Sequence, residues 1–144
     1  MRYQVTEFAF ELPDGWTHAN DANRLVCHGP NREELIATAT RVQGNPVERE
    51  LADLIERLWA HALKAATDAT SHPEFVVTSP LVEDTRNPVL PLAIVRARTR
   101  DSAVLFCVVT ARAEQSVLFV TFEASNDSTS VHSFDAFVDS LRRI

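Results

Sequence analysis

The 144-residue chain is poor in glycine and cysteine and has no long apolar run. Three unclustered glycines exclude the glycine-rich loops that bind nucleotide phosphates. No stretch approaches the roughly 20 apolar residues of a membrane-spanning helix. Basic residues are fewer than acidic ones: the chain has 14 Lys and Arg and 20 Asp and Glu, which gives a net charge of −6. This balance argues against a nucleic-acid binder, which needs clustered positive charge.

The two cysteines, Cys27 and Cys107, do not form a CxxC pair. Cys107 lies in the apolar run AVLFCVVTA, where cysteine usually acts as a small buried hydrophobe. We expect no disulfide between them, because nothing else in the sequence indicates an oxidising compartment. The opening MRYQVTEFAF lacks the continuous apolar stretch of a signal peptide, so we expect a cytoplasmic protein.

Catalytic and metal-binding patterns are equally hard to find. The five histidines show no HxH or HExxH spacing, so we expect no metal and no cofactor. Cys27 and His28 are neighbours in a predicted strand and therefore point to opposite faces, which is a poor arrangement for a nucleophile and its base. His132, Ser133 and Asp135 lack a nucleophile-turn motif, and we attribute the polar residues there to helix capping. The sequence therefore predicts a protein that is not an enzyme.

The opening of the chain predicts a half-buried strand. Residues 3–12 alternate, with Phe8, Phe10 and Leu12 facing one way. The turn sequence Pro-Asp-Gly ends this strand, and we expect Trp16, just beyond it, to fold back into the core. The polar stretch THANDAN that follows is interpreted as a loop.

Six further strands and two helices are predicted. The strands are RLVCH, ELIATATRV, EFVVTSPLV, LPLAIVRARTR, SAVLFCVVTAR and QSVLFVTFEA, and the short connections between several of them require antiparallel neighbours. A long helix over about 46–69 begins after Asn45 as N-cap and carries an apolar stripe at helical spacing. A C-terminal helix is expected in STSVHSFDAFVDSLRRI, capped by one of Ser128, Thr129 and Ser130, with Arg142 and Arg143 in its last turn.

This order predicts a single α+β domain over 1–144, with an antiparallel β-sheet, a long central helix and a C-terminal helix. The strands at 103–111 and 116–122 are apolar on both faces, which is the pattern of central strands buried on both sides. Either helices cover both faces, or one face binds something apolar. A row of Arg96, Arg98 and Arg100 could hold an anionic ligand, but we favour a solvated strand face.

The chain resembles the PsbP-like domains, and more closely the DcrB-related group that includes the Eag chaperones of bacterial type VI secretion. The likeness lies in an F-x-F-x-L-P-x-G-W opening and an F-x-x-F-x-x-S-L ending. The matching residues are Phe8, Phe10, Leu12, Pro13, Gly15 and Trp16, then Phe134, Phe137, Ser140 and Leu141. The resemblance implies a non-enzymatic, homodimeric chaperone whose sheet shields the transmembrane-like N-terminal helices of a secreted effector.

That function would place the partner on the sheet face opposite the helices. The residues expected there are Ile94, Val104, Phe106, Val108, Val117 and Phe119. Alternation does not show which side of a doubly apolar strand faces outward. A closed α/β/α sandwich without a groove remains an equal alternative. An immunity or adaptor protein that binds a toxin, and a small-ligand-binding domain, are the other functions that the sequence leaves open.

Overall fold

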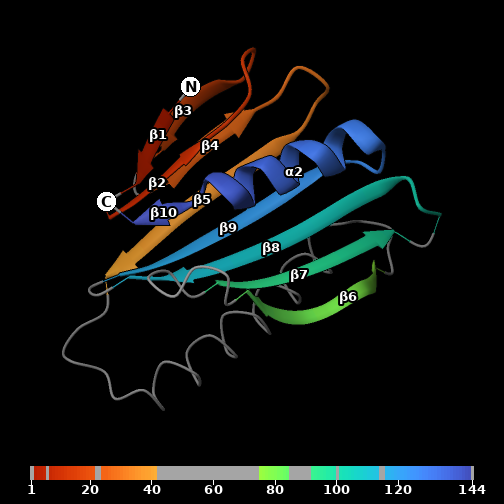
Figure 1. The fold of residues 1–144 in the computed structure, drawn as a ribbon. Coiled ribbons are helices and arrows are strands. Elements are labelled where there is room, and N and C mark those ends of the chain that lie inside the picture. Colours follow the sequence, from red (N-terminus) through yellow and green to blue (C-terminus); the bar gives the residue numbers. More distant parts are fainter. Residues whose placement is uncertain are drawn as a thin grey trace.

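A computed structural model of the chain describes residues 2–5, 7–21, 24–41, 75–84, 92–99, 101–113 and 116–143. In this part of the chain two antiparallel sheets and one helix make up the fold (Figure 1). The predicted long helix over about 46–69 lies outside the described residues. The predicted antiparallel sheet and C-terminal helix are confirmed.

The smaller sheet contains β1 (Arg2–Val5), β2 (Phe8–Glu11) and β10 (Arg142–Arg143), in the order β1-β2-β10. The prediction of one strand over 3–12 is therefore wrong, since the chain reverses between β1 and β2 to form a hairpin. The reversal sets Tyr3 opposite Phe10, and their rings stack with centroids 5.7 Å apart. The alternating apolar residues Phe8, Phe10 and Leu12 belong to the second strand of this hairpin and the residue after it, and they gave no sign of the first strand.

The larger sheet has seven strands in the order β3-β4-β5-β9-β8-β7-β6, all antiparallel to their neighbours. They are β3 (Thr17–Asp21), β4 (Arg24–His28), β5 (Glu34–Arg41), β6 (Phe75–Asp84), β7 (Leu92–Thr99), β8 (Val104–Arg112) and β9 (Ser116–Ser125). Six of these confirm predicted strands. The loop predicted for THANDAN is wrong, because β3 lies there at the edge of the sheet.

Helix α2 (Ser128–Ser140) begins at least one residue earlier than a cap at Ser128, Thr129 or Ser130 would allow. Its N-cap is Asp127, whose carboxylate accepts a hydrogen bond from the Ser130 backbone N–H at 2.8 Å. The predicted Ser or Thr cap is therefore wrong, and carboxylates are equally good caps. The helix also ends before Arg142 and Arg143, which form β10 against β2 instead of lying in its last turn.

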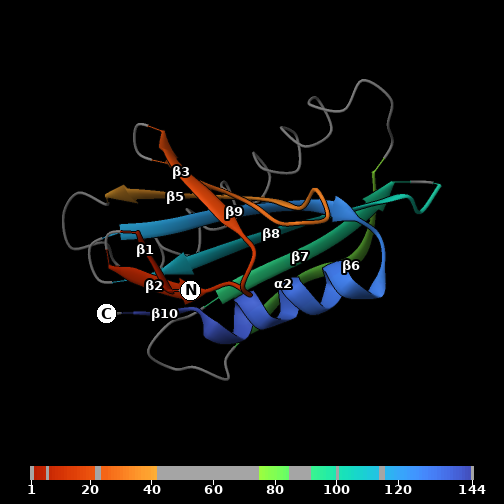
Figure 2. The ribbon, with the colours of Figure 1, turned by 90° about the horizontal axis from the view of Figure 1, so that it is seen from above.

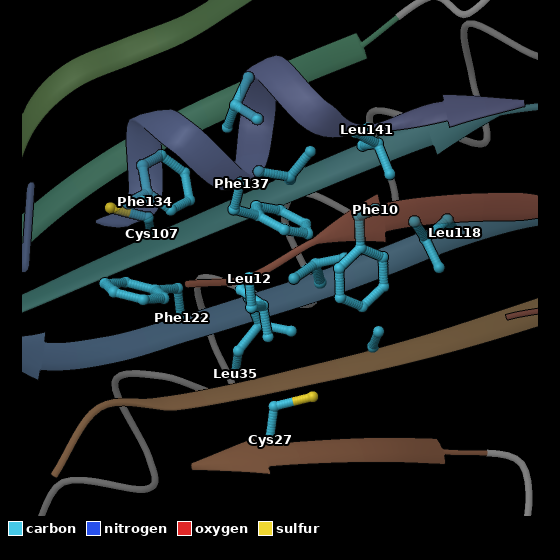
Figure 3. Packing of buried hydrophobic residues seen from close by; sticks show 14 of the residues in the cluster. Phe10, Leu12, Cys27, Leu35, Cys107, Leu118, Phe122, Phe134, Phe137 and Leu141 are labelled. Carbon is cyan, nitrogen blue, oxygen red and sulfur yellow. The ribbon is translucent and has the colours of Figure 1, made fainter. Parts of the chain in front are cut away.

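The core lies between one face of the larger sheet and a layer formed by α2 and the β1–β2 hairpin (Figure 2). Phe137 of α2 packs edge-on against Phe10, with ring centroids 5.0 Å apart, and Phe134 lies 5.3 Å from Phe122 of β9. All four rings are labelled in Figure 3, where Phe10 and Phe137 lie near the middle of the cluster and Phe134 and Phe122 at one side. Trp16 is buried, as predicted. We call the sheet face under α2 the helix-side face and the opposite one the far face.

Candidate partner-binding surface

The strand register assigns each side chain of the larger sheet to a face. Paired residues of antiparallel strands share a face, and successive residues alternate between faces. Cys107 pairs with Phe122, and Phe122 contacts Phe134 of α2, so this row belongs to the helix-side face. The next row, Val108 with Thr121, therefore lies on the far face.

Five of the six residues predicted to bind a partner share the far face. They are Val104, Phe106 and Val108 on β8, and Val117 and Phe119 on β9. Ile94 does not belong with them, because it pairs with Val109, is 8% exposed and joins the helix-side core. The prediction was one residue off in β7, where apolar residues on both faces hide the alternation.

The far face is closed in one region and open in another. Val108 and Val117 are only 3% and 2% exposed, so a partner cannot reach them without displacing what buries them. Val104, Phe106 and Phe119 are partly exposed. The accessible part of the predicted set is therefore these three side chains.

Two further apolar residues extend the accessible region across the sheet. Val26 of β4 pairs with Ile36 of β5, and Ile36 pairs with Thr121 of β9, so all three lie on the far face. Val26 and Ile36 are partly exposed. Sequence reasoning missed both, although each occupies an alternate position of a predicted strand.

We use the name far apolar surface for the partly exposed apolar residues of this face. They are Val26, Ile36, Val104, Phe106 and Phe119. They come from four strands that are consecutive in the sheet, in the order β4-β5-β9-β8. Contiguous apolar patches that stay accessible on a protein surface often mark interaction sites, which makes this face a candidate.

A polar row runs beside the far apolar surface. His28, Glu34 and Glu123 are successive cross-strand partners on β4, β5 and β9. The His28 Nε2 lies 3.3 Å from the Glu34 Oε2, and the two side chains are 54% and 44% exposed. Glu34 and Glu123 place two carboxylates directly opposite one another, which is unfavourable on a sheet.

Thr110 is a second polar exception on the far face. It pairs with Phe119, is only 3% exposed, and its hydroxyl has no hydrogen-bond partner. A buried polar group without a partner costs about 1–3 kcal/mol. Two features of the far face therefore lower the stability of the fold: the repulsion between Glu34 and Glu123, and the unpaired Thr110 hydroxyl.

Two members of the predicted arginine row, Arg96 and Arg98, lie on the helix-side face. The Arg96 Nη2 donates to the Asp135 Oδ1 at 2.7 Å, and the guanidinium carbon lies 4.8 Å from the centre of the Phe134 ring. Arg98 donates to the Ser102 hydroxyl and to the backbone carbonyl of Thr99 at 3.4 Å. The solvated row that we favoured is thus wrong for Arg96, which holds α2 on the sheet. Arg100 lies outside the described residues.

The cysteines are placed as hydrophobic core residues. Both are free and buried, and burial raises the pKa of Cys27 to about 11 and that of Cys107 to about 12. Thiols with such pKa values carry almost no thiolate at neutral pH, and the thiolate is the nucleophile. His28 lies on the far face and Cys27 on the helix-side face, which agrees with the predicted separation.

Metal ligands and membrane-spanning helices are also not found in the described part of the chain. No three His, Cys, Asp or Glu side chains there are grouped so that they could hold a metal ion. The same residues contain no helix long and apolar enough to cross a bilayer.

Comparison with known proteins connects the chain to one fold. The sequence matches no model of a known protein family, and it matches no curated protein. The solution structure of cyanobacterial PsbP (CyanoP) from Synechocystis sp. PCC 6803 superposes over 100% of this chain and 92% of its own, with a TM-score of 0.75. The chain has the PsbP fold. Sequence identity to CyanoP is 14%, so the likeness concerns the fold.

A crystal structure of a protein from Bacteroides thetaiotaomicron VPI-5482 is a more distant neighbour of this PsbP-fold chain. It covers 99% of this chain and 47% of its own, with a TM-score of 0.54 and 8% identity. The PsbP-like architecture expected from the two sequence motifs is therefore confirmed, whereas the DcrB-related or Eag assignment remains a prediction.

Proposed function

We propose that this protein is a non-enzymatic chaperone or adaptor that holds an apolar helical segment of a partner protein on the far apolar surface. The observation that carries the proposal is the gathering of partly exposed apolar side chains from four strands on one face. The buried, high-pKa thiols support a role without covalent catalysis. The opening and closing motifs support placing the chain with the DcrB-related and Eag-type chaperones of type VI secretion.

The physical basis is the burial of apolar surface. A transmembrane-like segment is unstable in water because its side chains stay hydrated, and each Å² of apolar area that it buries gains about 25 cal/mol. The same contact would cover Phe119 and Ile36, which are partly exposed in the monomer. Both partners therefore gain from association, and no cofactor is required.

A synthetic helical peptide with about 20 leucine and alanine residues is a suitable probe, because this length matches a membrane span. We expect Phe119→Asp and Ile36→Asp each to weaken binding at least about tenfold, since a carboxylate in an apolar contact loses its hydration. His132→Asp on the exposed side of α2 serves as the matched control. If both Phe119→Asp and Ile36→Asp bound the peptide as tightly as the wild-type protein, the proposal would be contradicted.

The folded state of each variant has to be checked in the same experiment. Phe119 and Ile36 are partly exposed, so their Asp variants should unfold cooperatively at a urea midpoint near that of the parent. Leu118→Asp, at the neighbouring and fully buried position, should unfold the domain. It shows how a variant behaves when the carboxylate is placed in a closed core. Unfolding of Phe119→Asp to the same extent would indicate a closed face.

The proposal includes a homodimer, which is supported by the sequence resemblance. It also includes a cytoplasmic location, with which the two free cysteines agree because disulfides are rare there. Sedimentation equilibrium at micromolar concentration measures the assembly state directly. A monomer at all concentrations would remove the dimer and leave the proposed binding surface in place.

A further inference from the structure

We propose that the far apolar surface selects partner segments that carry Lys or Arg beside their apolar stretch, and that Glu34 and Glu123 receive this basic end. The inference rests on the proposed function and names the chemistry of its partner. It is carried by the placement of the two carboxylates at the border of the apolar residues.

The register fixes this placement. Glu34 and Glu123 are direct cross-strand partners, so their Cβ atoms are about 4.5–5.5 Å apart. Two residues farther along the same strands, Ile36 and Thr121 form the next far-face pair. The carboxylates therefore adjoin the apolar row that continues through Val26.

The charges of the free protein favour the binding of a cationic group beside Glu34 and Glu123. Like charges directly opposite on a sheet repel one another, and no intervening strand separates Glu34 from Glu123. His28 lies on the other side of Glu34, at 3.3 Å, and both side chains are about half exposed, so this contact is worth little. A cation above the pair would attract both carboxylates and remove their repulsion.

The chemistry of that cation follows from its surroundings. His28, Glu34 and Glu123 are not grouped as a metal site. A flexible ammonium or guanidinium can approach both carboxylates and form charge-assisted hydrogen bonds with them. The long stems of Lys and Arg lie along apolar surface while their charged ends stay in water, so either can follow Ile36 to reach the carboxylates. A basic residue adjoining an apolar helix meets both requirements.

The far face also contains the unpartnered Thr110 hydroxyl, so two local costs occur on one face. Departures from local stability rules collect where a protein binds or reacts. Thr110 lies two far-face rows from the carboxylate pair, so the two costs are separate features of one face, and the carboxylate pair alone specifies the charge of the partner.

Two peptides separate the possibilities. Both have the same core of about 20 leucine and alanine residues, one flanked by lysines and the other by glutamates. We expect the wild-type protein to prefer the lysine peptide about tenfold at low salt, with the preference shrinking as salt screens the charges. Glu34→Gln combined with Glu123→Gln should abolish the preference.

The control is Asp14→Asn combined with Asp139→Asn, which changes the net charge equally at exposed positions outside the far face. This control should keep the preference, because the effect is local. Equal binding of both peptides by the wild type, or a preference that survives in the Glu34/Glu123 variant, would overturn the inference and leave the proposed function standing. Failure of both peptides to bind would overturn both proposals.

Discussion

Arg96 on β7 and Asp135 on α2 are joined by a hydrogen bond of 2.7 Å between Nη2 and Oδ1. The same guanidinium lies over the ring of Phe134, 4.8 Å from its centre. One side chain of the sheet thus makes both a charged and an aromatic contact with the helix. The β1–β2 hairpin holds the C-terminal end of α2, where the Glu11 backbone N–H donates to the Ser140 hydroxyl at 2.8 Å.

Replacing Arg96 should therefore weaken the docking of α2. We expect Arg96→Ala to lower the free energy of unfolding by about 1–2 kcal/mol, the sum of a partly exposed ion pair and a cation–π contact. Asp135→Asn should cost less, because it leaves the contact with Phe134 in place. Urea denaturation followed by circular dichroism measures both, with Arg98→Ala as the control. Equal effects of the Arg96 and Arg98 variants would show that the helix contact adds nothing.

Gly29 is predicted to tolerate no side chain. A Cβ atom there would lie 2.7 Å from the Glu33 Cδ and 2.9 Å from the Trp16 Cε2. Glu33 is 1% exposed and its Oε2 accepts a hydrogen bond from the Asn31 N–H at 2.9 Å, so it has little freedom to move away.

Gly29→Ala should therefore destabilise the protein by about 1–3 kcal/mol, the usual cost of overpacking. The combination with Glu33→Ala tests the cause, because shortening Glu33 removes part of the clash. In the Glu33→Ala background, Gly29→Ala should cost less than in the parent. The same cost in both backgrounds, measured by urea denaturation, would assign the strain to the backbone or to Trp16.

The two thiols should make stability fall at alkaline pH. Burial raises the pKa of Cys27 to about 11 and that of Cys107 to about 12, against about 8.5 in an unfolded chain. A group whose pKa is raised by folding stabilises fully below its unfolded pKa and loses that contribution as pH rises toward the folded value. The loss should therefore begin near pH 8.5 and continue toward about pH 11.

Urea midpoints at pH 7 and pH 10 measure this loss. The wild-type midpoint should fall more between these pH values than that of the Cys27→Ala/Cys107→Ala variant, which has no thiol to deprotonate. Parallel pH profiles of the two proteins would contradict the assignment. In addition, a thiol reagent at pH 8 should label neither cysteine in the folded protein and both in urea.

The strands of the larger sheet were predictable where apolar residues repeat. β4, β5, β8 and β9 contain such patterns, and the structure places strands at each of them. β3 was not predictable by this route. Its residues Thr17 to Asn20 are exposed, and the strand is held by main-chain pairing with β4. A polar edge strand leaves no hydrophobic period in the sequence.

The candidate site was predictable in part for a similar reason. Apolarity on both faces of β8 and β9 marked them as central strands, but it could not assign Ile94 of β7 to a face. Only the register, which pairs Ile94 with Val109, does so. Val26 and Ile36 were overlooked because each has apolar neighbours on both sides, so the sequence does not show which face is exposed. The opposition of Glu34 and Glu123 depends on pairing between strands far apart in sequence.

Backbone amide shifts in NMR spectra, recorded while the lysine-flanked peptide is added, test the central claim most directly. We expect the largest changes at the strand positions of Val26, Ile36, Glu123 and Phe119, with little change along the exposed side of α2. Such a pattern would locate the peptide on the far apolar surface. Changes concentrated on α2 or the β1–β2 hairpin, or no changes at peptide concentrations well above that of the protein, would contradict it.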